Sequence, residues 1–80
     1  MTKKQIKEMY NKMVNSCVAV KSLYKKGFYD YSTSSKKIDT YLKTYMVTLN
    51  ALLLFDVINA EQHHFGFDLI NNFDIELFDL

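Results

Sequence analysis

The side chains of this chain that are best suited to recognition chemistry are carboxylates and aromatic rings in its second half. They occur in the order Asp56, Glu61, Phe67, Asp68, Asp74, Glu76, Phe78 and Asp79. Carboxylates carry the charge of phosphates, and aromatic rings have the flat faces of bases, so this mixture suits a positively charged groove that normally holds nucleic acid. We therefore predict that these residues bind a partner protein.

No arrangement of residues typical of an active site is recognisable. No Ser, Cys or Lys stands in a motif with a base, and the two glycines are too few for a phosphate-binding loop. His63 and His64, with Asp68 nearby, are the best candidates for a metal cluster, but adjacent histidines on a helix point about 100° apart. We expect a protein that is not an enzyme and binds no metal or cofactor.

Charge is divided along the sequence. All ten lysines precede residue 44, together with Glu8, Asp30 and Asp39, whereas every later charged residue is acidic apart from the histidines. Such an asymmetry is typical of proteins with charged partners, and it also lets the two halves of a chain attract each other. The chain has no Arg, so forked contacts with phosphate or guanine are excluded.

A second candidate surface lies near the middle of the sequence. Four lysines surround three aromatic residues there: Lys25, Lys26, Lys36 and Lys37 around Phe28, Tyr29 and Tyr31. Aromatic rings in a basic patch can stack on nucleotide bases, which makes direct nucleic-acid binding an alternative function. We expect instead that these rings plug one end of a helical bundle while the lysines are solvated.

Two long helices must position these surfaces. Thr2 and Gln5 fit a capping box, apolar residues then recur at steps of three and four, and Gly27 suits the left-handed conformation that ends a helix. The pattern predicts a first helix from about Lys3 to Lys26. Cys17 lies on its apolar stripe, and we expect this single thiol to serve packing in a reducing compartment.

The second helix is predicted over residues 36–62, after a loop that ends in a cap at Ser34 or Ser35. An apolar stripe runs through it from Ile38 to Ile58. From Ala51 onward apolar residues occur on nearly all sides, so this end must be covered from more than one direction. A homodimer is one way to cover the surplus apolar surface.

Gly66 interrupts the helical pattern, and residues 67–80 fit two structures. A helix capped by Asp68 would have one apolar and one acidic face, whereas a β-hairpin would turn at Asn71 and Asn72. We prefer the helix because its apolar face would cover the end of the second helix. The predicted fold is mainly α, a small helical bundle with a long antiparallel αα-hairpin and a short C-terminal helix, in one domain of residues 1–80.

In size, composition and charge layout the whole chain resembles the small, Lys-rich, Arg-poor proteins with an acidic face that phages and mobile elements use as anti-CRISPR or other anti-defence inhibitors. The resemblance implies a non-catalytic inhibitor that binds a CRISPR effector nuclease or a similar enzyme and blocks guide, target or motif recognition. The basic first half differs from strongly acidic inhibitors of this type. We expect a cytoplasmic protein of the bacterial host cell, because the longest uncharged run, residues 44–55, falls short of the roughly 20 residues that span a bilayer.

The segment Asp74-Ile75-Glu76-Leu77-Phe78 resembles the pentapeptide with which bacterial proteins bind the sliding clamp. Leu77 and Phe78 match the strongest anchors of that motif, and Ile75 is a conservative replacement. Asp74 stands where the motif has Gln. The resemblance implies clamp binding as a further alternative function.

Overall fold

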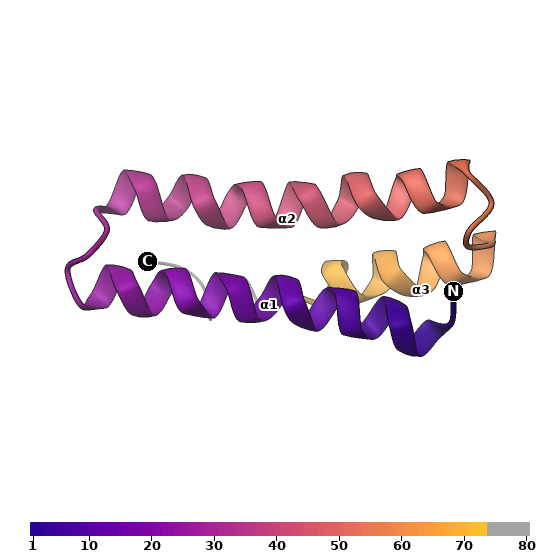
Figure 1. The fold of residues 1–80 in the computed structure, drawn as a ribbon, viewed down its shortest axis with the longest axis horizontal. Coiled ribbons are helices and arrows are strands. Elements are labelled where there is room, and N and C mark those ends of the chain that lie inside the picture. Colours follow the sequence, from indigo (N-terminus) through magenta and orange to yellow (C-terminus); the bar gives the residue numbers. More distant parts are fainter. Residues whose placement is uncertain (74–80) are drawn as a thin grey trace.

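Three α-helices make up the part of the chain that the computed structural model describes, residues 1–73: α1 (Lys3–Lys25), α2 (Tyr31–Leu54) and α3 (Ala60–Asn71). α1 and α2 pack antiparallel, and α3 turns back from the end of α2 to pack against both (Figure 1). This confirms the predicted mainly α bundle with a long αα-hairpin and a short C-terminal helix. No strand occurs within residues 1–73, and residues 67–70 are helical, so the alternative β-hairpin is wrong.

The bounds of α1 follow from contacts close in sequence. The Gln5 amide donates to Thr2 Oγ1 at 3.1 Å, and the Thr2 amide donates to Gln5 Oε1 at 2.7 Å, which completes the predicted capping box. At the other end Gly27 has a φ of +83°, in the left-handed region. Its amide donates to the Tyr24 carbonyl, and the Phe28 amide donates to the Leu23 carbonyl. Gly27 therefore ends α1 in the predicted way, and the last helical residue is Lys25, one residue before the predicted Lys26.

α2 begins five residues before the predicted Lys36, so the expected cap at Ser34 or Ser35 is wrong. Asp30 is the cap, and its Oδ1 accepts a hydrogen bond of 2.7 Å from the Thr33 amide. The hydroxyl-rich run is helical because the cap precedes it and because Ser34 packs inside the bundle, where it is fully buried. A small side chain at that position lets α1 approach α2 closely.

α2 ends at Leu54, well short of the predicted residue 62, because the chain reverses over residues 55–59. Asp56 adopts a left-handed φ of +58°, and the Val57 amide donates to the Leu52 carbonyl at 2.9 Å. Asn59 then opens α3 through a capping box with Gln62. The turn contains neither Gly nor Pro, so the apolar periodicity appears continuous from one helix to the next in the sequence.

Gly66 and Asp68 lie inside α3, and both predictions for them are wrong: Gly66 does not break a helix, and Asp68 does not cap one. Gly66 is where the three helices meet. A Cβ at this position would stand 2.7 Å from Leu49 Cδ1 and 3.1 Å from Ile6 Cγ2. The close approach that glycine permits outweighs its low helix propensity.

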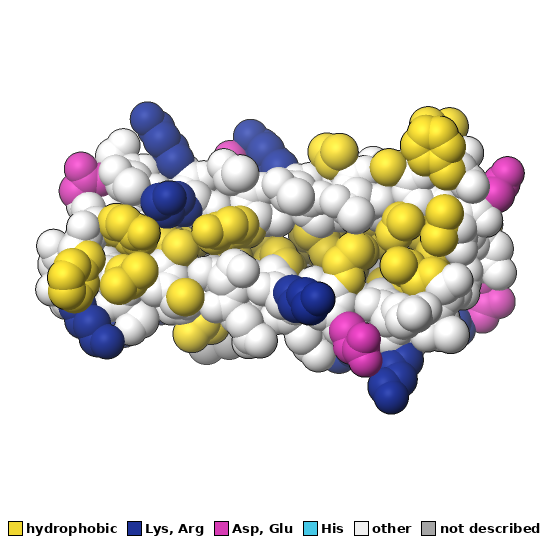
Figure 2. Space-filling model, viewed as in Figure 1, with side chains coloured by type: hydrophobic (Ala, Val, Ile, Leu, Met, Phe, Trp, Pro, Cys, Tyr) yellow, Lys and Arg dark blue, Asp and Glu magenta, His cyan; other side chains and the backbone are white. Residues whose placement is uncertain are grey.

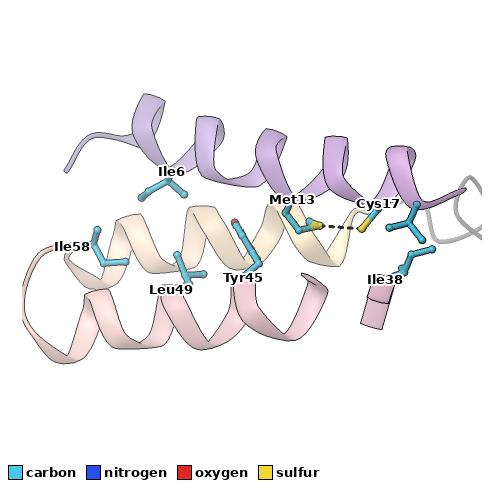
Figure 3. Packing of buried hydrophobic residues seen from close by; sticks show 8 residues of the cluster. Ile6, Met13, Cys17, Ile38, Tyr45, Leu49 and Ile58 are labelled. Carbon is cyan, nitrogen blue, oxygen red and sulfur yellow. Dashed lines mark hydrogen bonds between the residues drawn. The ribbon is translucent and has the colours of Figure 1, made fainter. Parts of the chain in front are cut away.

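The core runs along the middle of the bundle (Figure 3). Ile6, Leu49 and Cys17 are fully buried, and the Tyr45 hydroxyl donates to the Gly66 carbonyl at 2.7 Å. Cys17 Sγ lies 3.9 Å from Met13 Sδ, so the thiol serves packing as predicted. We call the end of the bundle around residues 26–30, with the adjoining turns of α1 and α2, the loop end. The end around residues 55–59, with the adjoining turns of α2 and α3, is the turn end.

Candidate protein-interaction surface

Three large apolar side chains are exposed at the turn end. Leu54 is 75% exposed, Phe55 74% and Val57 45%, whereas their neighbour Ile58 is buried. Figure 2 shows apolar side chains standing out from the surface over this end of α2. The C-terminal helix was expected to cover the exposed side of residues 51–58, but of the four apolar residues at 54, 55, 57 and 58 only Ile58 is buried. Adjacent exposed apolar side chains of this size are typical of protein-binding surfaces.

Asp56 lies at the centre of these apolar residues. Among the described residues, it is the only one other than Gly27 with a left-handed φ. A residue with a Cβ costs about 1–2 kcal/mol in that conformation, although Asp tolerates it better than most. Two backbone hydrogen bonds, from the Asp56 amide to the Leu53 carbonyl and from the Val57 amide to the Leu52 carbonyl, hold the turn in place. The exposed carboxylate is thus held on a fixed backbone between two exposed apolar residues.

The negative charge of Glu61, in the first turn of α3, is partly neutralised by a lysine of the same chain. Lys3 Nζ lies 2.8 Å from Glu61 Oε1, and this hydrogen bond and charge lower the pKa of the Glu61 carboxyl below its ordinary value. Both side chains are exposed. The antiparallel packing therefore places the start of α1, with Lys3, against the start of α3, with Glu61, which agrees with the expected attraction between the basic and acidic halves of the chain.

Phe67 and Asp68 lie farther along α3. Asp68 shares a face with Glu61, because residues seven apart are about two turns apart on a helix, and its Oδ2 lies 3.3 Å from His64 Nε2. Phe67 is 38% exposed and lies about 100° around the helix from Asp68. Asp56, Glu61, Phe67 and Asp68 therefore share one half of the bundle without forming a continuous acidic surface.

The other predicted partner-binding residues, Asp74, Glu76, Phe78 and Asp79, lie outside the described residues, as does the whole clamp-like pentapeptide of residues 74–78. The sequence did indicate the surplus of apolar residues at the end of α2. It assigned Leu54, Phe55 and Val57 to surplus apolar surface that a homodimer could cover, and not to the acidic and aromatic partner-binding surface.

The two histidines have separate partners. His63 Nε2 hydrogen-bonds Asn50 Oδ1 at 2.8 Å, while His64 faces Asp68. Within residues 1–73, no three His, Cys, Asp or Glu side chains are grouped as metal ligands would be.

At the loop end, the expectation that the aromatic rings plug the bundle is wrong for two of the three rings. Phe28 is 72% exposed and Tyr31 58% exposed, so these two rings do not plug the bundle. Tyr31 lies in the first turn of α2 and stacks edge-on against Tyr24, with ring centroids 6.2 Å apart. Tyr29 alone behaves as expected, because it packs against the core, with Lys37 Nζ 5.3 Å from its ring centroid.

Comparison with protein-family models, with curated proteins and with solved structures gave no match. Within the described residues, no helix has the length and apolar character needed to cross a membrane. Fold and surface together define a three-helix bundle that exposes an apolar turn with a carboxylate at its centre.

Proposed function

We propose that this chain is a non-enzymatic binding protein that docks its turn end onto another protein. The observation that carries the proposal is the exposure of Leu54 and Phe55, three quarters each, beside a left-handed Asp56. Asp56 has a charged side chain in a backbone conformation that disfavours side chains, and such residues are common at functional sites.

The turn end has the physical properties of an interface centre. Complete burial of a side chain such as Leu, Phe or Val contributes about 1.5–3 kcal/mol. The turn is already fixed by backbone hydrogen bonds, so little conformational entropy is lost on binding. Asp56 would face a Lys or Arg of the partner, and the surrounding apolar side chains would exclude water from that ion pair.

In its most specific form, the partner is a nucleic-acid-handling enzyme, and the chain acts as an anti-CRISPR-type inhibitor of a CRISPR effector nuclease. Such enzymes hold nucleic acid in positively charged channels, which attract carboxylates and accept aromatic rings. Asp56 and Asp68 supply exposed carboxylates in this half of the bundle, and Phe55 and Phe67 supply exposed rings.

Direct nucleic-acid binding at the loop end is the second candidate function. The exposure of Phe28 and Tyr31 favours it, because both rings lie in a stretch of sequence that Lys25 and Lys26 precede and Lys36 follows. Rings in such a setting stack on bases, and the lysines contact phosphates. The two candidate surfaces lie at opposite ends of a molecule whose longest dimension is 42 Å, so they can be tested separately.

Capture from a nuclease-treated bacterial lysate, with the whole chain as bait, tests the proposal. Wild type and Phe28→Ser should retain the same nucleic-acid-handling protein, and Phe55→Ser should lose it. Phe28→Ser is a matched control because it removes an equally exposed ring from the other end. A far-UV circular dichroism spectrum for each variant establishes that the bundle is folded.

The opposite pattern would favour the second candidate. In that case capture would disappear after nuclease treatment, and the purified chain would bind single-stranded DNA or RNA with an affinity that falls steeply with salt. Phe28→Ser would then weaken binding, and Phe55→Ser would leave it unchanged.

A further inference from the structure

Within residues 1–73, α3 covers the seam between α1 and α2 on one side only. α3 meets α1 at Ile6 and α2 at Leu49 and Asn50. Thr44 and Thr48 lie about 100° or more around α2 from Asn50, on the opposite edge of the seam. Both threonines are exposed. Figure 2 shows apolar side chains that follow the seam between the two long helices on the face it presents.

Two adjoining hollows lie on this side of α2, and the first of them spans the seam. It has a volume of about 200 Å³, with Met9 and Met13 of α1 and Tyr41 and Tyr45 of α2 among its lining residues. The second, of about 250 Å³, shares Tyr41 with the first and is lined by α2 residues alone, toward the start of that helix. Together they reach from residue 36 to residue 48, which is about 18 Å along a helix, or a little over three turns. We call this the seam groove.

The charge along the seam groove has one sign. The described residues that line the two hollows include Lys12, Lys36 and Lys37 and no carboxylate. The nearest carboxylate on α1 is that of Glu8, one turn before Lys12. Asp39 is turned away and pairs with Lys43 at 2.9 Å. An occupant with carboxylates on its flanks would therefore be attracted along the whole length of the groove.

We propose that the seam groove binds an acidic amphipathic helix of a partner protein. A helix of about 12 residues matches its length. Apolar side chains at positions i, i+4 and i+7 would lie on Met9, Met13 and Tyr41, and flanking Asp or Glu residues would face the lysines. Methionines suit such a floor because their flexible, polarisable side chains adapt to different apolar anchors. This second surface is distinct from the turn end and does not depend on its function.

Fluorescence anisotropy with two labelled synthetic peptides tests the proposal on the whole chain. One peptide has leucines at the i, i+4 and i+7 spacing and Glu at the flanking positions, and the other carries Lys in place of each Glu. The acidic peptide should bind saturably and more weakly as salt is raised, and the basic peptide should not bind.

Matched variants locate the site. Lys12→Glu should weaken binding of the acidic peptide about tenfold, whereas Lys4→Glu, with the same charge change on the outer face of α1, should leave it nearly unchanged. Phe55→Ser should also leave peptide binding unchanged, so the failure of either proposal can be distinguished from the failure of the other. Equal binding of both peptides, or of neither, would overturn the proposal. So would a dimer, detected by sedimentation, that Lys12→Glu dissociates, because the occupant would then be a second copy.

Discussion

The loop end and the turn end use the same backbone motif with different residues. At each, a helix ends in a left-handed residue, Gly27 after α1 and Asp56 after α2, and the amides of that residue and of the next one donate to carbonyls of the last turn. Nothing lies within 4 Å of the position that a Cβ on Gly27 would occupy, so glycine is used there for its backbone alone. The turn end keeps a carboxylate in a conformation that glycine would adopt more easily. This difference supports a role for the Asp56 side chain outside the bundle.

The two ends also differ in packing. Toward the turn end three helices meet around Leu49 and Gly66, while at the loop end only α1 and α2 are in contact among the residues that the structure describes. The loop end therefore relies on small, close-packed residues such as Cys17 and Ser34, both fully buried. More apolar surface is buried around a point where three helices converge than where two helices pack. We therefore expect truncation of a side chain there to destabilise the bundle most.

The largest effect is expected from truncation where the three helices meet. Leu49→Ala should lower the free energy of unfolding by about 2–5 kcal/mol, a large share of the total for so small a domain. Ile38→Ala, nearer the loop end and 9% exposed, should cost less because fewer neighbours lose contact. Urea denaturation followed by circular dichroism measures both. Leu49→Met is the control, because its volume is similar and its cost should be small. Equal losses at Leu49 and Ile38 would remove the packing difference between the ends.

Substitutions at the two left-handed residues should change the stability of the fold in opposite directions. Gly27→Ala should destabilise the chain by about 1–2 kcal/mol, because it places a Cβ in the left-handed conformation. Asp56→Gly should stabilise it by up to about 1 kcal/mol for the converse reason, while weakening partner binding at the turn end. Thermal unfolding of the two variants gives the comparison. A loss of stability in Asp56→Gly would mean that the carboxylate supports the turn itself.

The Tyr45 hydroxyl should make the three-helix region sensitive to alkaline pH. Burial, with a smaller contribution from Tyr10, raises the pKa of Tyr45 to about 12 from its ordinary value of 10. The folded state therefore holds this proton more tightly than the unfolded state, so its stabilisation is complete below pH 10 and is lost as the pH rises toward 12.

Tyr45→Phe tests this dependence. It should cost about 1 kcal/mol at neutral pH, because the Gly66 carbonyl loses its 2.7 Å hydrogen bond. It should also flatten the fall in stability above pH 10, leaving the drop due to Tyr10 and Cys17, because burial raises the pKa of each of these groups as well. Denaturation series at several pH values measure both effects. Tyr31→Phe, at an exposed ring of the loop end, should change neutral stability little. An unchanged alkaline fall in Tyr45→Phe would contradict this assignment.

The smallest effects concern one carboxylate at each end. The backbone amide of Thr33 lowers the pKa of Asp30, which caps α2, while Lys3 lowers the pKa of Glu61. Each carboxylate stabilises the fold above its unfolded pKa, and this stabilisation is lost as the pH falls through its folded pKa.

Salt should separate these two contributions. The exposed Lys3–Glu61 pair should weaken as salt is added, whereas the hydrogen bonds at Asp30 should persist. Asp30→Asn keeps an acceptor for the Thr33 amide and should remove the salt-resistant part of the acid dependence. Lys3→Gln should remove the salt-sensitive part. Thermal unfolding at acid and neutral pH, in low and high salt, checks the assignment, which would be wrong if both variants responded to salt alike.

The sequence alone was sufficient for α1, where the deciding contacts are local. Thr2 and Gln5 bond to each other across a single helical turn, and Gly27 ends α1 through its own backbone, so both ends of that helix were predictable. The apolar periodicity likewise identified the antiparallel pair and the buried Cys17. The acidic and aromatic residues of α3 were recognisable as a group, although their surroundings were not.

Only the tertiary structure decided the features that depend on residues far apart in the sequence. A glycine stands inside α3 at position 66 because Leu49 and Ile6 occupy the space that a side chain would fill. The packing that this permits outweighs the low helix propensity of glycine. The packing of α3 stabilises a turn that has no glycine, which ends α2 at Leu54 and leaves Leu54 and Phe55 exposed. Antiparallel packing also brings Lys3 to Glu61 across 58 positions of the sequence. Local pattern cannot specify such contacts, because they exist only once the three helices have packed together.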